Sequence, residues 1–360
     1  MANGLPLRDD NGSDRPSRVR EFLRPEREGR RTRLRVEIAV LVIGLTLVLV
    51  GAWLVPQDFG NDNRWYLRLA WSAFMVRVLH FHIGLMLLVV ALLAAAMRAY
   101  RLALIAVPAI VLTVVVPLTW GTWHSAPASK GPPLRVMSIN LLVGSAGDEQ
   151  VLDDIDDARP DVLVLQEYDD LWHDSLHEAL SDDYPHFKVA LRGDSFGLGV
   201  YSRTPLTEPD DGYQLTLGDG TLPQFRVRMQ HAGSELTIYA VHLLPPIGLD
   251  YTAETRRQFA DLVDNIEQEG GPVIVAGDLN ATEATPHHAA LADAGMSDAW
   301  SLAGSGRGST WPATRYLRLL PGLRLDHVYV SRDLTVTRVR TGNDSESDHR
   351  PVTADVALRR

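Results

Sequence analysis

The chain has 360 residues and a net charge of −10, but the charge is divided unevenly: residues 1–130 hold 16 Lys and Arg against 9 Asp and Glu, a net of +7, whereas the remainder holds 19 against 36, a net of −17. A basic first third and an acidic remainder indicate two separate parts. Because 46% of the residues are hydrophobic and none is cysteine, general disorder, disulfide scaffolds, zinc–thiolate sites and a cysteine nucleophile are excluded.

The first 35 residues are rich in arginine, with ten of them ahead of the first hydrophobic segment. Positively charged segments next to a membrane span remain in the cytoplasm. The sequence therefore predicts a basic cytoplasmic tail over residues 1–35.

Three segments without Asp, Glu, Lys or Arg follow, at residues 38–55, 81–97 and 102–118. Each has the length of roughly 17 to 25 residues that a helix needs to cross a bilayer. Pro108 interrupts the third segment, which a membrane helix tolerates better than a soluble one. The alternative is a set of buried helices in a soluble protein, but three such segments in close succession leave little polar surface to cover them. We predict a three-span membrane anchor over residues 36–119.

The segment 65–79 is apolar but contains Arg68 and Arg77, which is typical either of an interfacial helix or of the lead-in to the second span. Three crossings that start from a cytoplasmic tail place everything after residue 119 outside the cytoplasm. The loop 56–80 and its arginines are then external, against the usual charge rule, but the arginines of the tail outnumber them. We expect a multi-pass protein of the cell membrane with an extracytoplasmic domain.

The anchor is followed by a predicted linker, residues 120–133, because residues 125–133 are small residues and prolines with one lysine. Residues 134–360 have short apolar runs bounded by turn residues, which predict strands at 134–139, 162–165, 198–201, 225–229, 236–241, 273–276 and 325–330. Helices are expected at 151–158 and 252–269. Several strands adjoin without a helix between them, which favours an α/β domain of two packed mixed sheets with flanking helices over a simple doubly wound sheet.

Polar side chains occupy the ends of these predicted strands. The residues are Asn140, Glu167, His242, Asp278 with Asn280, Asp326, and the adjacent pair Asp348 and His349. If each residue is considered alone, it is interpreted as an ordinary turn or surface residue. Strand ends in α/β layers meet along one crevice, however, so that carboxylates, amides and imidazoles at six of them indicate a single site.

The motifs around these residues resemble the endonuclease/exonuclease/phosphatase superfamily. In chain order they are SINL, LQE, FGLGVYSR, VHL, GDLN, STW, RLDHVYVS and SDHRPV. The layout is similar to that of a membrane-anchored subgroup associated with teicoplanin resistance. The resemblance implies a four-layered α/β sandwich in residues 134–360 that hydrolyses phosphoesters with the help of Mg²⁺, with Mn²⁺ as an alternative.

The resemblance also implies a division of roles among the polar residues. Glu167 is implied to be the main metal ligand, with Asn140 and Asp348 close to the metal. Carboxylate and amide oxygens are the ligands that Mg²⁺ prefers.

The remaining residues are implied to act on the substrate and on water. Asp278 is implied to orient or deprotonate the attacking water, and Asn280 to hold that water or a phosphate oxygen. His349 is expected against the phosphate, with Asp326 fixing its tautomer and favouring its protonated form. His242 is implied to be a second donor to the phosphate or the leaving group.

Weaker signals concern substrate binding. Arg256 is a candidate phosphate contact, the alternative being a solvated helix face. Trp311 is a candidate for the mouth of the site, the alternative being an anchor in the core. His287 and His288 are expected in a surface loop.

The choice of substrate follows from charge and tethering. A net charge of −17 without a basic cluster disfavours a nuclease, which needs a basic surface for the phosphate backbone. Tethering to a bilayer favours a lipid-linked phosphate or pyrophosphate. A membrane-tethered DNA or RNA phosphodiesterase and a non-catalytic phosphate-binding domain are the alternatives, and no protein partner follows from the sequence.

Overall fold

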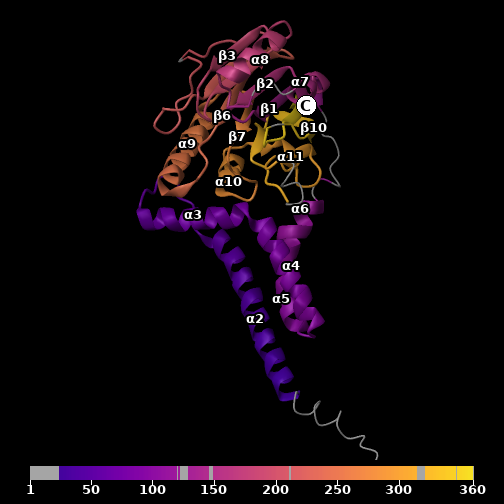
Figure 1. The fold of residues 1–360 in the computed structure, drawn as a ribbon. Helices are drawn as coiled ribbons and strands as arrows, with labels where there is room; N and C mark the ends of the chain where they lie inside the picture. Colours follow the sequence, from indigo (N-terminus) through magenta and orange to yellow (C-terminus); the bar gives the residue numbers. More distant parts are fainter. Residues whose placement is uncertain are drawn as a thin grey trace, which may run out of the picture.

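The computed structural model describes residues 24–119, 121, 129–145, 149–210, 212–313, 321–345 and 347–359. It consists of a stem of helices with an α/β domain at one end (Figure 1). The first 23 residues of the predicted tail, and residues 120 and 122–128 of the predicted linker, lie outside the described part.

The stem is built from long apolar helices. They are α2 (Arg24–Leu54), α3 (Arg64–Val78), α4 (His80–Ala96), and a continuous rod of α5 (Tyr100–Ile110), η1 (Val111–Val115) and α6 (Val116–Thr119). Residues 29–54 and 100–119 are each long and apolar enough to cross a membrane, whereas α4 meets this test only together with α3, from which it is bent by 66°. Two of the three predicted spans are therefore supported by length and composition. The π-helical turn η1 follows Pro108, which removes a backbone donor from the rod.

The helices of the stem approach one another closely. A Cβ atom on Gly84 of α4 would lie 2.2 Å from Oγ1 of Thr113, so only glycine fits at this crossing. Arg35 near the start of α2 donates a hydrogen bond to the carbonyl oxygen of Met97 at 3.1 Å. The basic start of α2 and the turn at residues 97–99 therefore lie at one end of the stem, and the domain lies at the other (Figure 1).

Two mixed sheets form the domain. The first has the strand order β10-β11-β1-β2-β4-β3 and the second β5-β6-β7-β9-β8. The first sheet contains β1 (Ser129–Asn140), β2 (Val162–Gln166), β3 (His186–Ala190), β4 (Leu198–Ser202), β10 (Leu334–Thr341) and β11 (Val352–Arg359). The second contains β5 (Phe225–His231), β6 (Ser234–His242), β7 (Val273–Asp278), β8 (Ser297–Asp298) and β9 (Asp326–Val330).

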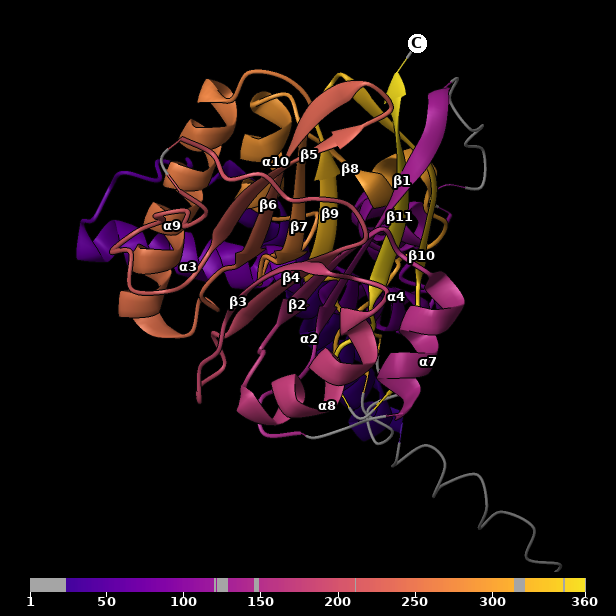
Figure 2. The same cartoon turned by 90° about the horizontal axis from the view of Figure 1, so that it is seen from above.

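Helices cover the outer faces of both sheets (Figure 2). The first sheet is covered by α7 (Glu149–Ala158) and α8 (Asp170–Ser181), and the second by α9 (Gly248–Gln268) and α10 (Pro286–Asp293), while α11 (Ala299–Ala303) is a short helix after β8. Alternation along β1 places Val136 in the core between the sheets and Met137 in the core under the helices. The prediction of two packed mixed sheets with flanking helices is confirmed.

All seven predicted strands are present, and the structure adds β3, β8, β10 and β11. The first strand also begins earlier than predicted. Ser129 and Lys130 pair with Arg359 and Leu358 of β11, so this part of the predicted linker belongs to the sheet.

Helix α3 docks on the domain, and it lies across the domain end of the stem (Figure 1). Phe74 and Val78 are buried in the same core cluster as Phe259 of α9. Nε1 of Trp71 donates a hydrogen bond to the carbonyl oxygen of Pro246 at 2.9 Å, and Nε of Arg77 donates one to Ala284 at 2.6 Å. The contact fixes the position of the stem relative to the second sheet.

Candidate active site

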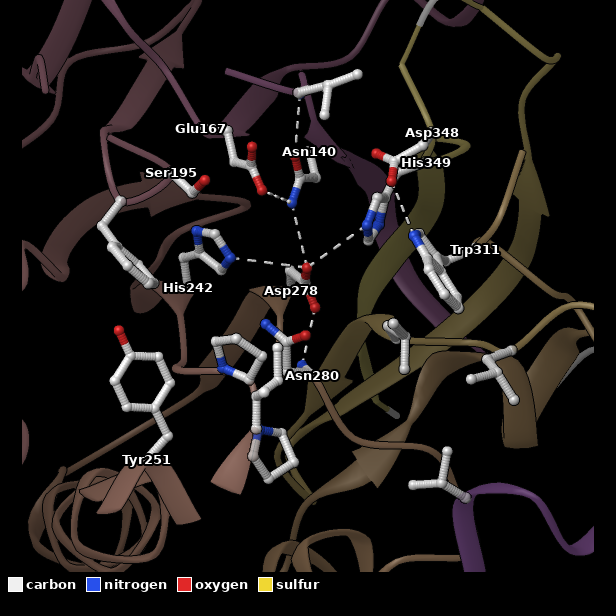
Figure 3. A pocket seen from close by; sticks show the side chains of 18 of the residues that line it. Asn140, Glu167, Ser195, His242, Tyr251, Asp278, Asn280, Trp311, Asp348 and His349 are labelled. Carbon is white, nitrogen blue, oxygen red and sulfur yellow. Dashed lines mark hydrogen bonds and ion pairs between the residues drawn. The ribbon is translucent and has the colours of Figure 1, made fainter. Parts of the chain in front are cut away.

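The strand topology brings the predicted site residues to one edge of the domain. In the first sheet β1 and β2 are parallel, and Asn140 pairs with Gln166 immediately before Glu167. In the second sheet β6 and β7 are parallel, and His242 pairs with Asp278. Asp326 begins the antiparallel strand β9 directly opposite Asp278. Because the two sheets pack face to face, these ends converge (Figure 3).

The backbone is strained next to this edge. Glu167 has a φ of 56° and Asn280 a φ of 50°, a left-handed conformation that costs a residue with a side chain about 1 to 3 kcal/mol. Gly277 has a φ of 152°, and a Cβ atom there would lie 1.8 Å from the carbonyl oxygen of Val241. The glycine of the GDLN motif is therefore required by the close approach of β6. Strain of this kind gathers at functional sites.

Asp278 lies at the centre of the cluster and is 1% exposed. Its Oδ2 accepts a hydrogen bond from Nδ2 of Asn140 at 3.2 Å, and its Oδ1 accepts one from the backbone of Asn280 at 2.8 Å. Nε2 of His242 and Nε2 of His349 lie 3.7 Å and 3.9 Å from the same Oδ2 atom (Figure 3). One carboxylate is thus flanked by an amide and two imidazoles.

His349 is held in one tautomer by Asp326. Nδ1 of His349 donates to Oδ2 of Asp326 at 2.7 Å, which leaves Nε2 directed at the cavity. Burial alone would lower the pKa of His349, but the charge and hydrogen bond of Asp326, with the carboxylates of Asp278 and Asp348, raise this pKa to about 10. The ring therefore carries a positive charge at neutral pH.

The pKa values of His242 and Asp278 are shifted in opposite directions. Burial and, to a smaller extent, the charge of His349 lower the pKa of His242 to about 4, so His242 is a neutral imidazole. Burial raises the pKa of Asp278, as does the neighbouring carboxylate of Asp326, while His349 opposes the shift. A neutral and a charged imidazole thus face one carboxylate of raised basicity, an arrangement suited to proton transfer.

Further carboxylate and amide oxygens line the same cavity. Glu167 accepts hydrogen bonds from Nδ2 of Asn140 at 3.1 Å and from the backbone of Val143 at 2.9 Å. Asp348 accepts one from Nε1 of Trp311 at 2.9 Å. These side chains line a cavity of about 680 Å³ together with Asp278 and His349. Carboxylate and amide oxygens around open space suit a hard divalent cation that keeps several waters.

Two groups of side chains are candidates for binding such a cation. Among the described residues, Asp278, Asp326 and His349 have possible ligand atoms within 4.8 Å of one another. The short hydrogen bond between His349 and Asp326 and the positive charge of the ring occupy this trio, so a cation there would be repelled. Glu167, whose carboxylate accepts from an amide and a backbone N–H and lines the same cavity, fits the cation better.

Arg256 does not lie in the cavity. Its guanidinium group donates to the carbonyl oxygen of Asp58 and faces the ring of Phe59 at 5.0 Å. The prediction of a substrate contact at Arg256 is not supported, because the side chain holds the loop before α3 against α9. Trp311, in contrast, lines the cavity.

The structure also corrects the expectation for His287 and shows wall residues that the sequence did not indicate. His287 is 3% exposed, because α10 starts at Pro286 and turns this side chain inward. Helix α3 contributes Trp71, Phe74 and Met75 to the wall of the cavity. The apolar character of segment 65–79 was the only sequence signal for this wall.

Two packed mixed sheets that bring carboxylates, amides and histidines to one edge have the architecture and the chemistry of a metal-dependent phosphoesterase. A sequence profile of the Endonuclease/Exonuclease/phosphatase family matches residues 137–349, more than half of the chain, and the chain belongs to this family. Its members are metal-dependent phosphoesterases and nucleases, and the protein is an enzyme that hydrolyses phosphoester bonds.

Two solved structures that are described as members of this family share the fold, and a third solved structure is a weaker match. An endonuclease/exonuclease/phosphatase from Beutenbergia cavernae is 22% identical, with a TM-score of 0.50, and the match covers 64% of this chain and 72% of that one. A family protein from Bacteroides thetaiotaomicron is 17% identical, with a TM-score of 0.50, and the match covers 64% of this chain and all of that one. The 3′ phosphatase NExo from Neisseria is 19% identical, with a TM-score of 0.47 and coverage of 62% and 98%. No curated protein sequence matches the chain.

Proposed function

We propose that the protein is a membrane-anchored, Mg²⁺-dependent hydrolase that acts outside the cytoplasm on a lipid-linked phosphate or pyrophosphate, with Mn²⁺ as an alternative metal. One observation carries the proposal: the cavity that contains Asp278 and His349 is walled on one side by α3, the helix between the apolar helices α2 and α4. When the stem is inserted in a bilayer, a site in this position lies at the membrane surface.

The charge of the cavity supports a lipid substrate over a nucleic acid. None of the described residues that line it is Lys or Arg, whereas the carboxylates of Glu167, Asp194, Asp278 and Asp348 do line it. A nucleic acid presents many phosphates and requires a basic groove. A single phosphate or pyrophosphate group can be neutralised by one divalent cation and the imidazolium of His349.

The residues supply the following chemistry. Glu167, with Asn140 and Asp348 beside it, would hold the cation, which stabilises negative charge on the phosphate and lowers the pKa of a water. Asp278 orients the attacking water and takes its proton, because a carboxylate of raised pKa is a better base.

The phosphate is held by donors that lie around Asp278. His349 donates from Nε2 to a phosphate oxygen, and Asp326 keeps the ring charged. His242 is the second imidazole at the reacting group, and Asn280 is a further amide beside it. The water oxygen bonds to phosphorus as the bond from phosphorus to the leaving oxygen breaks.

The orientation of the stem follows from its charges. The contact of Arg35 with Met97 places the basic start of α2 beside the turn that carries Arg98, and this end would be cytoplasmic. If α4 is the second of three crossings, the domain is outside. Arg77, on the domain side, is engaged with the carbonyl oxygen of Ala284, so it is bound at the interface with the domain.

A reporter fused after Arg360 tests this placement, using an alkaline phosphatase that is active only outside the cytoplasm and a fluorescent protein that folds only inside. Phosphatase activity is the expected result. Fluorescence with no phosphatase activity would refute the external location.

The activity is tested with the full-length protein on polyprenyl pyrophosphate, sphingomyelin, DNA and RNA, with Mg²⁺ and with EDTA. Turnover of the polyprenyl substrate that EDTA abolishes is expected. Glu167→Ala and Asp278→Asn should abolish it while the melting temperature is kept, and Asp170→Asn on the surface of α8 is the matched control. Cleavage of DNA or RNA without lipid turnover would favour the nuclease, and phosphate binding without any turnover would favour a binding domain.

A further inference from the structure

The candidate active site has one apolar wall, which is assembled from two distant parts of the sequence. Helix α3 contributes Trp71, Phe74, Met75 and Val78. The segment 245–251, which leads from β6 into α9, contributes Pro245, Pro246, Ile247 and Tyr251. We refer to these eight side chains as the apolar wall.

The part of the wall at the start of α9 is unusually exposed. In the described residues between 129 and 359, the exposed large hydrophobic side chains are Leu171, Phe187, Ile247 and Tyr251. Ile247 is 73% exposed and Tyr251 47% exposed, and both line the same cavity. Exposed hydrophobic groups that gather at one site mark a binding surface, whereas isolated ones need no explanation.

The wall is held in a fixed position relative to the polar residues. Nδ2 of Asn280 donates a hydrogen bond to the carbonyl oxygen of Leu243 at 2.8 Å. Three residues further along, the carbonyl oxygen of Pro246 accepts the hydrogen bond from Trp71 of α3 at 2.9 Å. One short segment therefore connects the amide of the active site with the helix that lies across the stem. Figure 3 shows Tyr251 and Asn280 on the same side of Asp278.

We propose that the apolar wall binds the hydrocarbon chain of the substrate, directly beside the phosphate that is cleaved, and makes the enzyme selective for long chains. The proposal rests on the function proposed above and identifies the part of the substrate that provides affinity. The wall is continuous with the phosphate site at one end and with the stem at the other. This arrangement fits a molecule that has a phosphate at one end and a membrane-soluble chain at the other.

The test measures kcat/KM of the full-length protein in detergent for isopentenyl, geranyl, farnesyl and geranylgeranyl pyrophosphate. The wild-type value should rise with chain length. Ile247→Ser should lower kcat/KM for the geranylgeranyl substrate about tenfold and leave the value for the isopentenyl substrate within about twofold, because the short chain can contact far less of the wall than the long chain does.

Three further variants distinguish the contribution of α3 to chain binding from a general effect of a more polar surface. Met75→Ser should act like Ile247→Ser, and Met75→Leu should retain wild-type selectivity. Leu171→Ser is the matched control, because Leu171 is 51% exposed but lies on α8, which covers the other sheet. It should change neither value.

The outcomes distinguish this proposal from the function on which it rests. A wild-type enzyme that hydrolyses all four pyrophosphates with equal kcat/KM, or serine variants that keep the full dependence on chain length, would refute the wall as a chain site and leave the lipid pyrophosphatase standing. Cleavage of nucleic acid with no turnover of any pyrophosphate would refute both.

Discussion

Acidification should weaken the contact between the stem and the domain, through the buried side chain of His287. This ring packs against three aromatic rings, those of Phe59, Phe74 and Phe259. Neither of its ring nitrogens has a hydrogen-bond partner among the described residues. Burial lowers the pKa of His287 to about 3, and the positive charges of Arg256 on α9 and Arg77 on α3 contribute to the shift.

The sign and size of the effect follow from linkage. The unfolded chain has a histidine pKa of about 6.5, so between about pH 6.5 and pH 3 it binds more protons than the folded protein and stability falls as the pH falls. At pH 5 the loss from this one group is about 2 kcal/mol relative to pH 8. For a domain of this size, the loss corresponds to a decrease of roughly 4 to 8 °C in melting temperature.

The assay is thermal unfolding of the full-length protein in detergent at about pH 8, 6.5 and 5. His287→Leu replaces the imidazole with an apolar side chain that does not titrate. Between pH 8 and pH 5 it should therefore lose about 2 kcal/mol less stability than the wild type does. His186→Leu, at a half-buried histidine in β3, is the matched control and should follow the wild type. Parallel melting curves for the wild type and His287→Leu at all three pH values would refute the reasoning.

Three further outcomes are expected. Asp326→Asn removes the carboxylate that keeps His349 charged. Steady-state kinetics at pH 8 should show a loss in kcat of roughly 100- to 1000-fold, at an unchanged melting temperature. A rate within about twofold of wild type would exclude the charged ring from the mechanism. Trp311→Phe deletes the hydrogen bond to Asp348, so the Mg²⁺ concentration for half-maximal rate should rise roughly 10- to 100-fold, and an unchanged metal titration would place the cation elsewhere. Gly277→Ala directs a Cβ atom to within 1.8 Å of a backbone oxygen, so thermal unfolding should show a loss of at least about 3 kcal/mol, and a wild-type melting temperature would contradict the close packing of β6 and β7.

The residues of the site could be predicted because each belongs to a local pattern. An apolar run such as residues 273–276 predicts a buried strand, and a polar residue such as Asp278 directly after it is at the strand end. Parallel neighbours then bring such ends together, as the pairing of His242 with Asp278 shows. At these residues the sequence motif, the predicted strand and the observed position at the strand end agree with one another.

The missed strands lack such a local signal. In β10, the run from Leu334 to Thr341 contains Arg338 and Arg340, and it is an edge strand with a register shift between Val336 and Arg338. An edge strand needs less apolar surface than a central one. Its pairing with β11 is therefore decided by tertiary contacts.

The docking of α3 could not be predicted for a different reason. Its contacts join residues 175 positions apart, in the case of Trp71 and Pro246, and 207 positions apart, in the case of Arg77 and Ala284. Segment 65–79 is apolar on more than one face, and nothing in its local pattern distinguishes a face that contacts lipid from a face that contacts protein. The wall of the cavity depends on this docking, so the sequence alone points to Arg256, and not to α3, as a substrate contact.

The net charge of the domain is negative, so it cannot provide the affinity for an anionic substrate, and other interactions have to do so. In the part of the cavity that the structure describes, the positive charges are the imidazolium of His349 and the proposed cation at Glu167, and they suffice for one phosphate or pyrophosphate group. Further affinity has to come from apolar contact, which falls off much less with salt than the attraction of a basic groove does. The wall from Trp71 to Tyr251 provides such contact at the end of the cavity nearest the stem. A substrate with a charged head and a long hydrocarbon chain therefore matches both parts of the site. A nucleic acid matches neither, because the described residues that line the cavity include no Lys or Arg and one wall is apolar.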